Sequence, residues 1–200
     1  SGWGELLKGY ETQHMSESRL RARLQGEGKA KQLLEDKLGR FAEGDIRDIL
    51  SALNTDFSND KEKHNRFMPA FYGSLANQIA GSLEAFNCWS EKLWRVADDQ
   101  LNNLLDDFWT ENEVAGGGTS LPTAILYLRE PDKYAIWIPA MEHGLKTVLP
   151  SLKLGKRRTS EGYRVYNDAV QSLREQLGFN PQVMDIVLTL ASRDKGTPSD

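Results

Sequence analysis

The stretch of residues 71–94, FYGSLANQIAGSLEAFNCWSEKLW, decides the fold that we expect for this chain. Its large apolar side chains recur at steps of three and four residues, and the same spacing continues through residues 101–109. Such spacing places the apolar side chains on one face of each helix. Four of the five tryptophans lie from this stretch to Trp137, so we expect the hydrophobic core here.

The residues before this stretch are polar and charge-mixed, and they predict a helical arm. Ser16 can cap a first helix, which we expect Gly26 and Gly28 to divide or kink. Asp45 can cap a second, shorter helix. Residues 54–65 are rich in Asn, Asp and Lys, which predicts a polar connector at the boundary of the arm.

The fold that these patterns predict is all-α: a compact multi-helix domain with a helix-hairpin-helix-like element, plus a short N-terminal helical arm. A chain of 200 residues can bury a sizeable core without disulfides. The expected segments are the arm at residues 1–59, the helical domain at 60–193 and a linker at 194–200.

A glycine run, Gly116-Gly117-Gly118, is followed by Thr119, Ser120 and an apolar stretch. It predicts a tight turn between two helices, with Thr119 or Ser120 as the N-cap of the second. Backbone N–H groups at such a helix start can bind a phosphate. A turn with only a structural role is the alternative. Thr119 stands where a nucleotide-binding loop has its lysine, so we do not expect nucleoside triphosphate binding.

The strongest charge asymmetry lies in residues 146–164, which carry six basic side chains and one acid, a net charge of +5. Because the whole chain has a formal net charge of −4, the remainder carries −9. Basic side chains gathered on a loop neutralise phosphates and release counterions. A solvated loop without a ligand is the alternative. The six basic residues are Lys146, Lys153, Lys156, Arg157, Arg158 and Arg164.

Hydroxyl groups accompany these bases, since Thr159, Ser160 and Tyr163 can donate hydrogen bonds to phosphates. Residues 84–113, by contrast, carry eight acids and two bases, so we do not expect that face to meet a phosphate backbone. The DNA-binding residues that we predict are Gly116, Gly117, Gly118, Thr119, Ser120, Lys153, Lys156, Arg157, Arg158 and Arg164.

Signals for catalysis are weak. The three histidines lie far apart in the sequence and have no ligand-like spacing to Cys88. The sequence contains no serine-nucleophile or zinc-protease motif. We therefore expect no catalytic residue, no metal and no cofactor, and we expect that this chain is not an enzyme.

Two residue types near the core have alternative interpretations. Cys88 is flanked by Phe86 and Trp89, which predicts a buried thiol on an apolar helix face. The tryptophans could stack on a flipped base, but their helical spacing favours a place in the core.

The chain lacks the signals that direct a protein to a membrane or out of the cell. No apolar run approaches the ~20 residues that span a bilayer. The N-terminus has no signal peptide pattern. We therefore expect a cytoplasmic protein without membrane contact.

Several segments carry a family resemblance: Arg66–Gly73, Asn87–Trp89, Leu93-Trp94, Gly116–Pro122 and Pro131–Trp137. Together they resemble the helical domains that precede the ATPase module in McrB-like AAA+ proteins of restriction and phage-defence systems. The resemblance covers the region from residue 60 to residue 190. It implies a domain that places an attached AAA+ motor on DNA, with modified bases among its targets.

Within this region, Gly116–Trp137 is similar to the helix-hairpin-helix of DNA glycosylases. In active glycosylases an aspartate stands in the short run that follows, whereas residues 136–140, IWIPA, contain no carboxylate. The hairpin also lacks the lysine of bifunctional lyases. This resemblance therefore implies DNA contact without base excision.

The expected function is a non-catalytic DNA-recognition domain of a McrB-like AAA+ protein. Its expected partners are double-stranded DNA, modified DNA included, and an AAA+ motor in the same polypeptide, with a homo-oligomer formed through the full-length protein. The main alternative is a helical interaction or assembly module of a multidomain ATPase, in which acidic residues 84–113 and charged residues 16–40 contact another protein. A degenerate glycosylase is a third, lesser alternative. The DNA hypothesis requires that the glycine turn and the basic loop lie on the same side of the molecule, and that nearby carboxylates do not neutralise the basic side chains.

Overall fold

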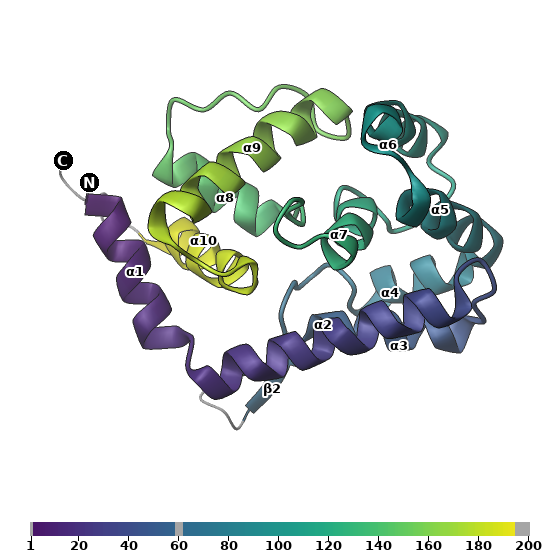
Figure 1. Cartoon of the computed structure of the whole chain (residues 1–200), viewed down its shortest axis with the longest axis horizontal. Coiled ribbons are helices and arrows are strands. Elements are labelled where there is room, and N and C mark those ends of the chain that lie inside the picture. The colour runs from purple at the N-terminus through teal and green to yellow at the C-terminus, as the bar shows by residue number, and fades with distance from the viewer. Residues whose placement is uncertain (1, 59–61, 195–200) are drawn as a thin grey trace.

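A computed structural model describes residues 2–58 and 62–194 (Figure 1). Within these residues the chain forms ten α-helices, two short 3-10 helices and one antiparallel hairpin, which confirms the all-α prediction. Of the linker expected at 194–200, all but the first residue lies outside the described residues. The elements are α1 Gly2–His14, α2 Glu17–Lys37, α3 Glu43–Asn54, β1 Thr55–Ser58, β2 Glu62–Asn65, α4 Gly73–Gly81, α5 Leu83–Arg95, η1 Asp98–Gln100, α6 Leu101–Glu111, α7 Ser120–Arg129, α8 Pro139–Val148, α9 Ser160–Leu177, η2 Pro181–Val183 and α10 Met184–Arg193.

Helix α7 lies at the centre of the fold. Every residue from Ser120 to Leu128 is buried, and Figure 1 shows the helix with other helices on several sides. It packs against α5 and against α2. The apolar stretch after the glycine run therefore forms a central helix, which holds the preceding turn in a fixed place.

The N-terminal helices share the hydrophobic core with the rest of the chain. Leu7 of α1, Leu34 of α2 and Ile46 of α3 are all buried in it. Helix α1 lies against α10 at one end of the molecule (Figure 1), where the hydroxyl of Tyr10 donates to Asp194 at 2.6 Å. The arm therefore packs on the helical domain and does not project from it.

Helix α2 is continuous from residue 17 to residue 37, so the break expected at Gly26 and Gly28 is wrong. The reason for one glycine is steric. A Cβ at Gly26 would lie 2.5 Å from the carbonyl oxygen of Ala52 in α3. Glycine at this position allows α2 and α3 to pack closely, and it does not interrupt the helix.

The polar segment at residues 54–65 is not a simple connector. Thr55–Ser58 pairs with Glu62–Asn65 as an antiparallel hairpin. The first strand contributes Asp56, a carboxylate with only 1 % exposure. The boundary expected at residues 59–60 therefore falls between two paired strands.

Candidate nucleic-acid interface

The turn between α6 and α7 has a backbone conformation that requires glycine. Gly116 and Gly118 have φ angles of +77° and +53°, which residues with a Cβ rarely adopt. A Cβ at Gly116 would also lie 2.9 Å from the carbonyl oxygen of Leu75 in α4. Trp109 Nε1 donates to the carbonyl oxygen of Gly118 at 2.9 Å, so α6 holds the turn in place.

The two hydroxyl groups at the start of α7 are engaged within the protein. Thr119 is the N-cap residue, but its hydroxyl donates to the carbonyl oxygen of Trp137 at 2.8 Å and makes no capping hydrogen bond. The hydroxyl of Ser120 donates to the carbonyl oxygen of Gly117 at 3.1 Å. Among the described residues, the backbone N–H groups of Gly118, Thr119 and Ser120 have no acceptor, as is usual in the first turn of a helix. A phosphate at this turn would therefore bind to backbone N–H groups.

A cleft of about 490 Å³ brings this turn together with the end of the basic loop. The other residues that line it are Pro69, Ala70, Leu75, Gln78, Asn112, Ala115 and Pro139. Of the described residues that line it, none is an Asp or a Glu, and we call it the acid-free cleft. The glycine turn and part of the basic loop therefore lie on the same side of the molecule. The predicted residues that line this cleft are Gly116, Gly118, Thr119, Ser120, Arg157 and Arg158.

Arg157 is partly neutralised by a buried acid. Its Nη2 lies 2.6 Å from Glu142 Oε2, and Lys146 Nζ lies 3.5 Å from the same oxygen. Glu142 also accepts a hydrogen bond from Trp137 Nε1 at 3.0 Å. Burial raises the pKa of Glu142, but the hydrogen bonds from Arg157 and Trp137 outweigh burial and hold the pKa below its ordinary value. Ionised Glu142 therefore cancels part of the charge expected on this loop.

Arg158 is the more available cation of the pair. Its side chain is exposed, and its φ angle of +58° marks a sharp turn of the backbone. Within the described chain its guanidinium has no hydrogen-bond or ion-pair partner. An unpaired guanidinium can bind a phosphate through two parallel hydrogen bonds.

The remaining predicted bases lie outside this cleft. Lys153 and Lys156 line a second groove of about 520 Å³, which they share with the acids Asp106 and Glu161. Arg164 lies on α9 and contributes to neither lining, and its Nη1 is 3.6 Å from Asp168. The structure therefore divides the predicted site. The predicted residues outside the acid-free cleft are Gly117, which is buried under the turn, Lys153, Lys156 and Arg164.

A carboxylate already occupies the start of α9. Asp106 accepts hydrogen bonds from the backbone N–H of Ser160 at 2.7 Å and from its hydroxyl at 2.8 Å. Thr159 caps the same helix, and the hydroxyl of Tyr163 donates to the carbonyl oxygen of Ala135 at 2.7 Å. The three hydroxyls that we expected to bind phosphate are thus engaged within the protein.

The tryptophans pack as the helical spacing favours. Trp137 is buried and stacks on Tyr166 with ring centroids 5.4 Å apart, and Trp109 meets Trp137 edge-on at 5.9 Å. Cys88 differs from the prediction, because its side chain is exposed. Neighbours along a helix point in different directions, so Trp89 faces the core while Cys88 faces solvent.

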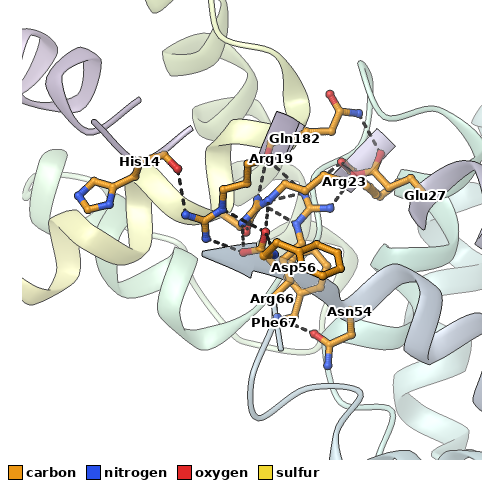
Figure 2. Close-up of polar contacts among 12 residues, drawn as sticks. His14, Arg19, Arg23, Glu27, Asn54, Asp56, Arg66, Phe67 and Gln182 are labelled. Carbon is orange, nitrogen blue, oxygen red and sulfur yellow. Dashed lines mark hydrogen bonds and ion pairs between the residues drawn. The ribbon is translucent and has the colours of Figure 1, made fainter. Parts of the chain in front are cut away.

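A second group of charged side chains lies inside the molecule (Figure 2). Arg19 and Arg23 of α2 both donate to Asp56 of β1, with shortest distances of 2.6 and 2.8 Å. Arg23 and Arg66 both donate to Asp185 of α10 at 2.9 Å. These contacts join α2 to the hairpin and to α10. We call this group, Arg19, Arg23, Glu27, Asp56, Arg66 and Asp185, the buried charge cluster.

The buried arginines and carboxylates of the cluster are balanced, and His64 lies at its edge with Nε2 3.6 Å from Asp56. Glu27 accepts from Arg66 Nη1 at 2.7 Å and from the hydroxyl of Tyr127 at 2.5 Å. Three arginines therefore face three carboxylates. In residues 2–58 and 62–194, no buried side-chain nitrogen or oxygen lacks a hydrogen-bond partner. The cluster holds elements together and leaves no polar group free for a ligand.

A sequence signal for this cluster existed, although our sequence interpretation missed it. The buried residues of α2 continue one helical stripe across charged and apolar types: Arg19, Arg23, Glu27, Ala30 and Leu34. Their spacing shows that the charges point inward. It also removes Arg19, Arg23 and Glu27 from the protein-binding face expected at residues 16–40. No comparable pattern indicated that residues 69–78 would line the cleft.

Comparison with protein-family models, with curated proteins and with solved structures finds no match to this chain. In the part of the chain that the structure describes, no three His, Cys, Asp or Glu side chains are grouped so that they could hold a metal ion. No helix there has the length and the apolar character that are needed to cross a bilayer. A functional proposal therefore rests on the cleft and its charges.

Proposed function

We propose that this chain is a non-catalytic DNA-recognition domain that binds the phosphate backbone of duplex DNA at the acid-free cleft. The observation that carries the proposal is the meeting of the glycine turn with Arg157 and Arg158 on a molecule of net charge −4. A local cationic surface is sufficient for this role, because recognition depends on where the charges lie.

Two kinds of donor support phosphate binding in this cleft. The free N–H groups of Gly118, Thr119 and Ser120 lie at the N-terminus of α7, where the helix dipole favours an anion. Arg158 adds an unpaired positive charge to the same cleft. Backbone amides fix the position of a phosphate, and the guanidinium supplies most of the attraction.

Lys153 and Lys156 have a weaker place in this proposal. Both side chains are exposed, but Asp106 and Glu161 line the same groove. These lysines therefore contribute to long-range attraction of DNA more than to a defined contact.

The biological setting that we propose follows from the McrB-like resemblance. In this setting the domain places an AAA+ motor of the same polypeptide on duplex DNA, with modified bases among its targets, and the motor brings several copies together. A Walker-type ATPase sequence after residue 200 of the full gene product is the expected result. A different catalytic module there would contradict the setting and leave the phosphate site unaffected.

The phosphate site is tested by measuring duplex affinity at ~50 and ~200 mM salt. Contact of Arg158 with a phosphate, with a smaller contribution from the partly neutralised Arg157, predicts that affinity falls roughly three- to tenfold across this range. Arg158→Glu should weaken binding at ~50 mM salt by a similar factor. Arg95→Glu on α5 is the control for total charge, because Arg95 is also exposed, lies outside the cleft and undergoes the same change of charge; unlike Arg158, it has an ion pair, with Glu91 at 3.7 Å.

Two results would contradict the phosphate site. The first is an affinity that does not change with salt. The second is an equal loss in the Arg158 and Arg95 variants, since this would indicate a response to total charge and no defined site.

A protein-interaction module is the second candidate, and the acidic surface of α5, η1 and α6 favours it. Glu84, Asp99, Asp107 and Glu111 are exposed there, and basic partners are attracted to such a surface. A mass that rises with concentration in size-exclusion chromatography, without any duplex binding, is the result that this candidate predicts.

A further inference from the structure

Large apolar side chains are exposed in one loop beside the cleft. Among the described residues, the exposed large hydrophobic side chains are Leu24, Met68 and Tyr72, with exposures of 49 %, 59 % and 50 %. Leu24 lies alone on α2, whereas Met68 and Tyr72 lie four residues apart in the segment between β2 and α4. Single exposed apolar residues are ordinary, but two in one short loop require an explanation.

This loop is anchored, so its exposed side chains are held in place. Phe67 and Phe71 are buried, and their rings meet edge-on with centroids 6.1 Å apart. The guanidinium of Arg66 lies 4.6 Å from the centre of the Phe67 ring and is itself fixed in the buried charge cluster. Buried residues on either side, Phe67 before Met68 and Phe71 before Tyr72, hold the backbone while Met68 and Tyr72 are exposed.

The same loop contributes to the acid-free cleft. Pro69 and Ala70 line it together with Gly118 and Arg158. Met68 directly precedes these two lining residues, and Tyr72 follows them by two positions. The two apolar side chains therefore flank, along the chain, the part of the loop that faces the proposed phosphate site.

We propose that Met68 and Tyr72 contact the bases of a duplex whose backbone lies in the cleft, and that they partly unstack one base step. Apolar side chains that enter DNA next to cationic contacts act as such wedges, and an aromatic face stacks on any base. The proposal rests on the proposed DNA-binding function. A cationic cleft without acids favours a nucleic acid over a protein as the occupant of this surface.

The test compares affinity for a fully paired duplex with affinity for the same duplex with one T·T mismatch. Unstacking costs less at a mismatch, so the wild-type chain should bind the mismatched duplex about tenfold more tightly. In Met68→Ser/Tyr72→Ser the preference should disappear, while the dependence of binding on salt remains. Serine is well accepted at position 72, the N-cap of α4.

Two further variants control this experiment. Leu24→Ser removes a side chain of matched exposure on another element and should keep the mismatch preference. Met68→Ser/Tyr72→Phe retains an aromatic face and should restore part of the preference that the double serine variant loses. Circular dichroism of each variant checks that it is folded.

Three results would overturn the inference, and they can be distinguished. Salt-dependent binding without a mismatch preference in the wild-type chain contradicts the wedge alone. A preference that the double serine variant retains does the same. Absence of binding to either duplex contradicts the phosphate site and the wedge together. If the wild-type chain then forms a dimer and the double serine variant does not, this surface binds a second copy of the chain.

Discussion

Two groups of arginines in this molecule have opposite roles. Arg19, Arg23 and Arg66 are buried, and each donates to at least one buried carboxylate at 2.9 Å or less. Arg157 and Arg158 lie on the surface, where one shares a carboxylate with Lys146 and the other has no partner among the described residues. The carboxylates within reach therefore decide whether an arginine holds the fold or remains available to a ligand.

Removing one carboxylate from the buried charge cluster should have the largest effect, a loss of stability of the fold. Asp56→Ala leaves Arg19 without a carboxylate in the interior, and it leaves Arg23 with only Asp185, which Arg66 shares. We expect the free energy of unfolding to fall by about 3–5 kcal/mol, the usual result of removing one partner from a buried ion pair. Urea denaturation measures this change.

A matched control distinguishes the loss of a buried carboxylate from the loss of any aspartate. Asp48→Ala in α3 removes an exposed carboxylate that has no ion pair in the described chain, and it should change the free energy by less than about 0.5 kcal/mol. Equal effects in the two variants would show that the buried charge cluster contributes little.

Lowering the pH should reduce the free energy of unfolding through the same buried charge cluster, and this effect should be the next largest. Burial raises the pKa of Asp56, but the hydrogen bonds and charges of Arg19 and Arg23 outweigh it and hold the pKa well below its ordinary value. The pKa of Asp185 is also lowered, because Arg23 and Arg66 outweigh its burial. The unfolded chain then binds more protons than the folded chain near its carboxyl pKa of about 3.9.

This stabilisation is therefore present above about pH 4 and is lost as pH falls toward the folded-state pKa values. Unfolding free energies measured between pH 6 and pH 3 should decline, with a shallower slope in Asp56→Asn than in the wild-type chain. An unchanged slope in that variant would contradict the account of Asp56.

A smaller effect, on duplex affinity, is expected from Glu142, the carboxylate that partly neutralises Arg157. Glu142→Gln removes the carboxylate that neutralises it and keeps an oxygen that can accept from Trp137 Nε1. Duplex affinity at ~50 mM salt should rise about threefold, as one more cation becomes available to phosphates. Unchanged affinity, measured by fluorescence anisotropy, would indicate that Arg157 does not face DNA.

The smallest effect is expected at Arg164. This residue was predicted to bind DNA, but it lies outside the acid-free cleft and beside Asp168. Arg164→Ala should reduce duplex affinity by less than about twofold, since its charge is exposed, lies beside a carboxylate and is screened by salt. A tenfold loss would return Arg164 to the site and enlarge the interface along α9.

The helical class of the fold could be predicted from the spacing of apolar side chains, because that spacing depends only on nearby residues. Long-range contacts explain the errors. Gly26 resembles a helix breaker until the carbonyl oxygen of Ala52 is placed beside it. Asp56 resembles part of a polar connector until two arginines more than thirty residues away are placed around it.

The sequence predicted only in part which residues lie together in the candidate site. The glycine run and the basic run indicated phosphate binding, and Arg157 and Arg158 do line the cleft at the turn. The sequence does not show that Glu142 lies beside Arg157, or that Asp106 accepts hydrogen bonds from Ser160 at the start of α9, in the groove of Lys153 and Lys156. Charge summed along the chain therefore overestimates the charge available at the surface.

The most direct test of the phosphate site is a titration of the ¹⁵N-labelled chain with duplex DNA, followed by NMR at ~50 mM salt. We predict that the largest chemical shift changes occur at the backbone amides of Gly118, Thr119 and Ser120 and at the side chain of Arg158. Changes confined to α5 and α6, or no changes at these amides, would contradict it.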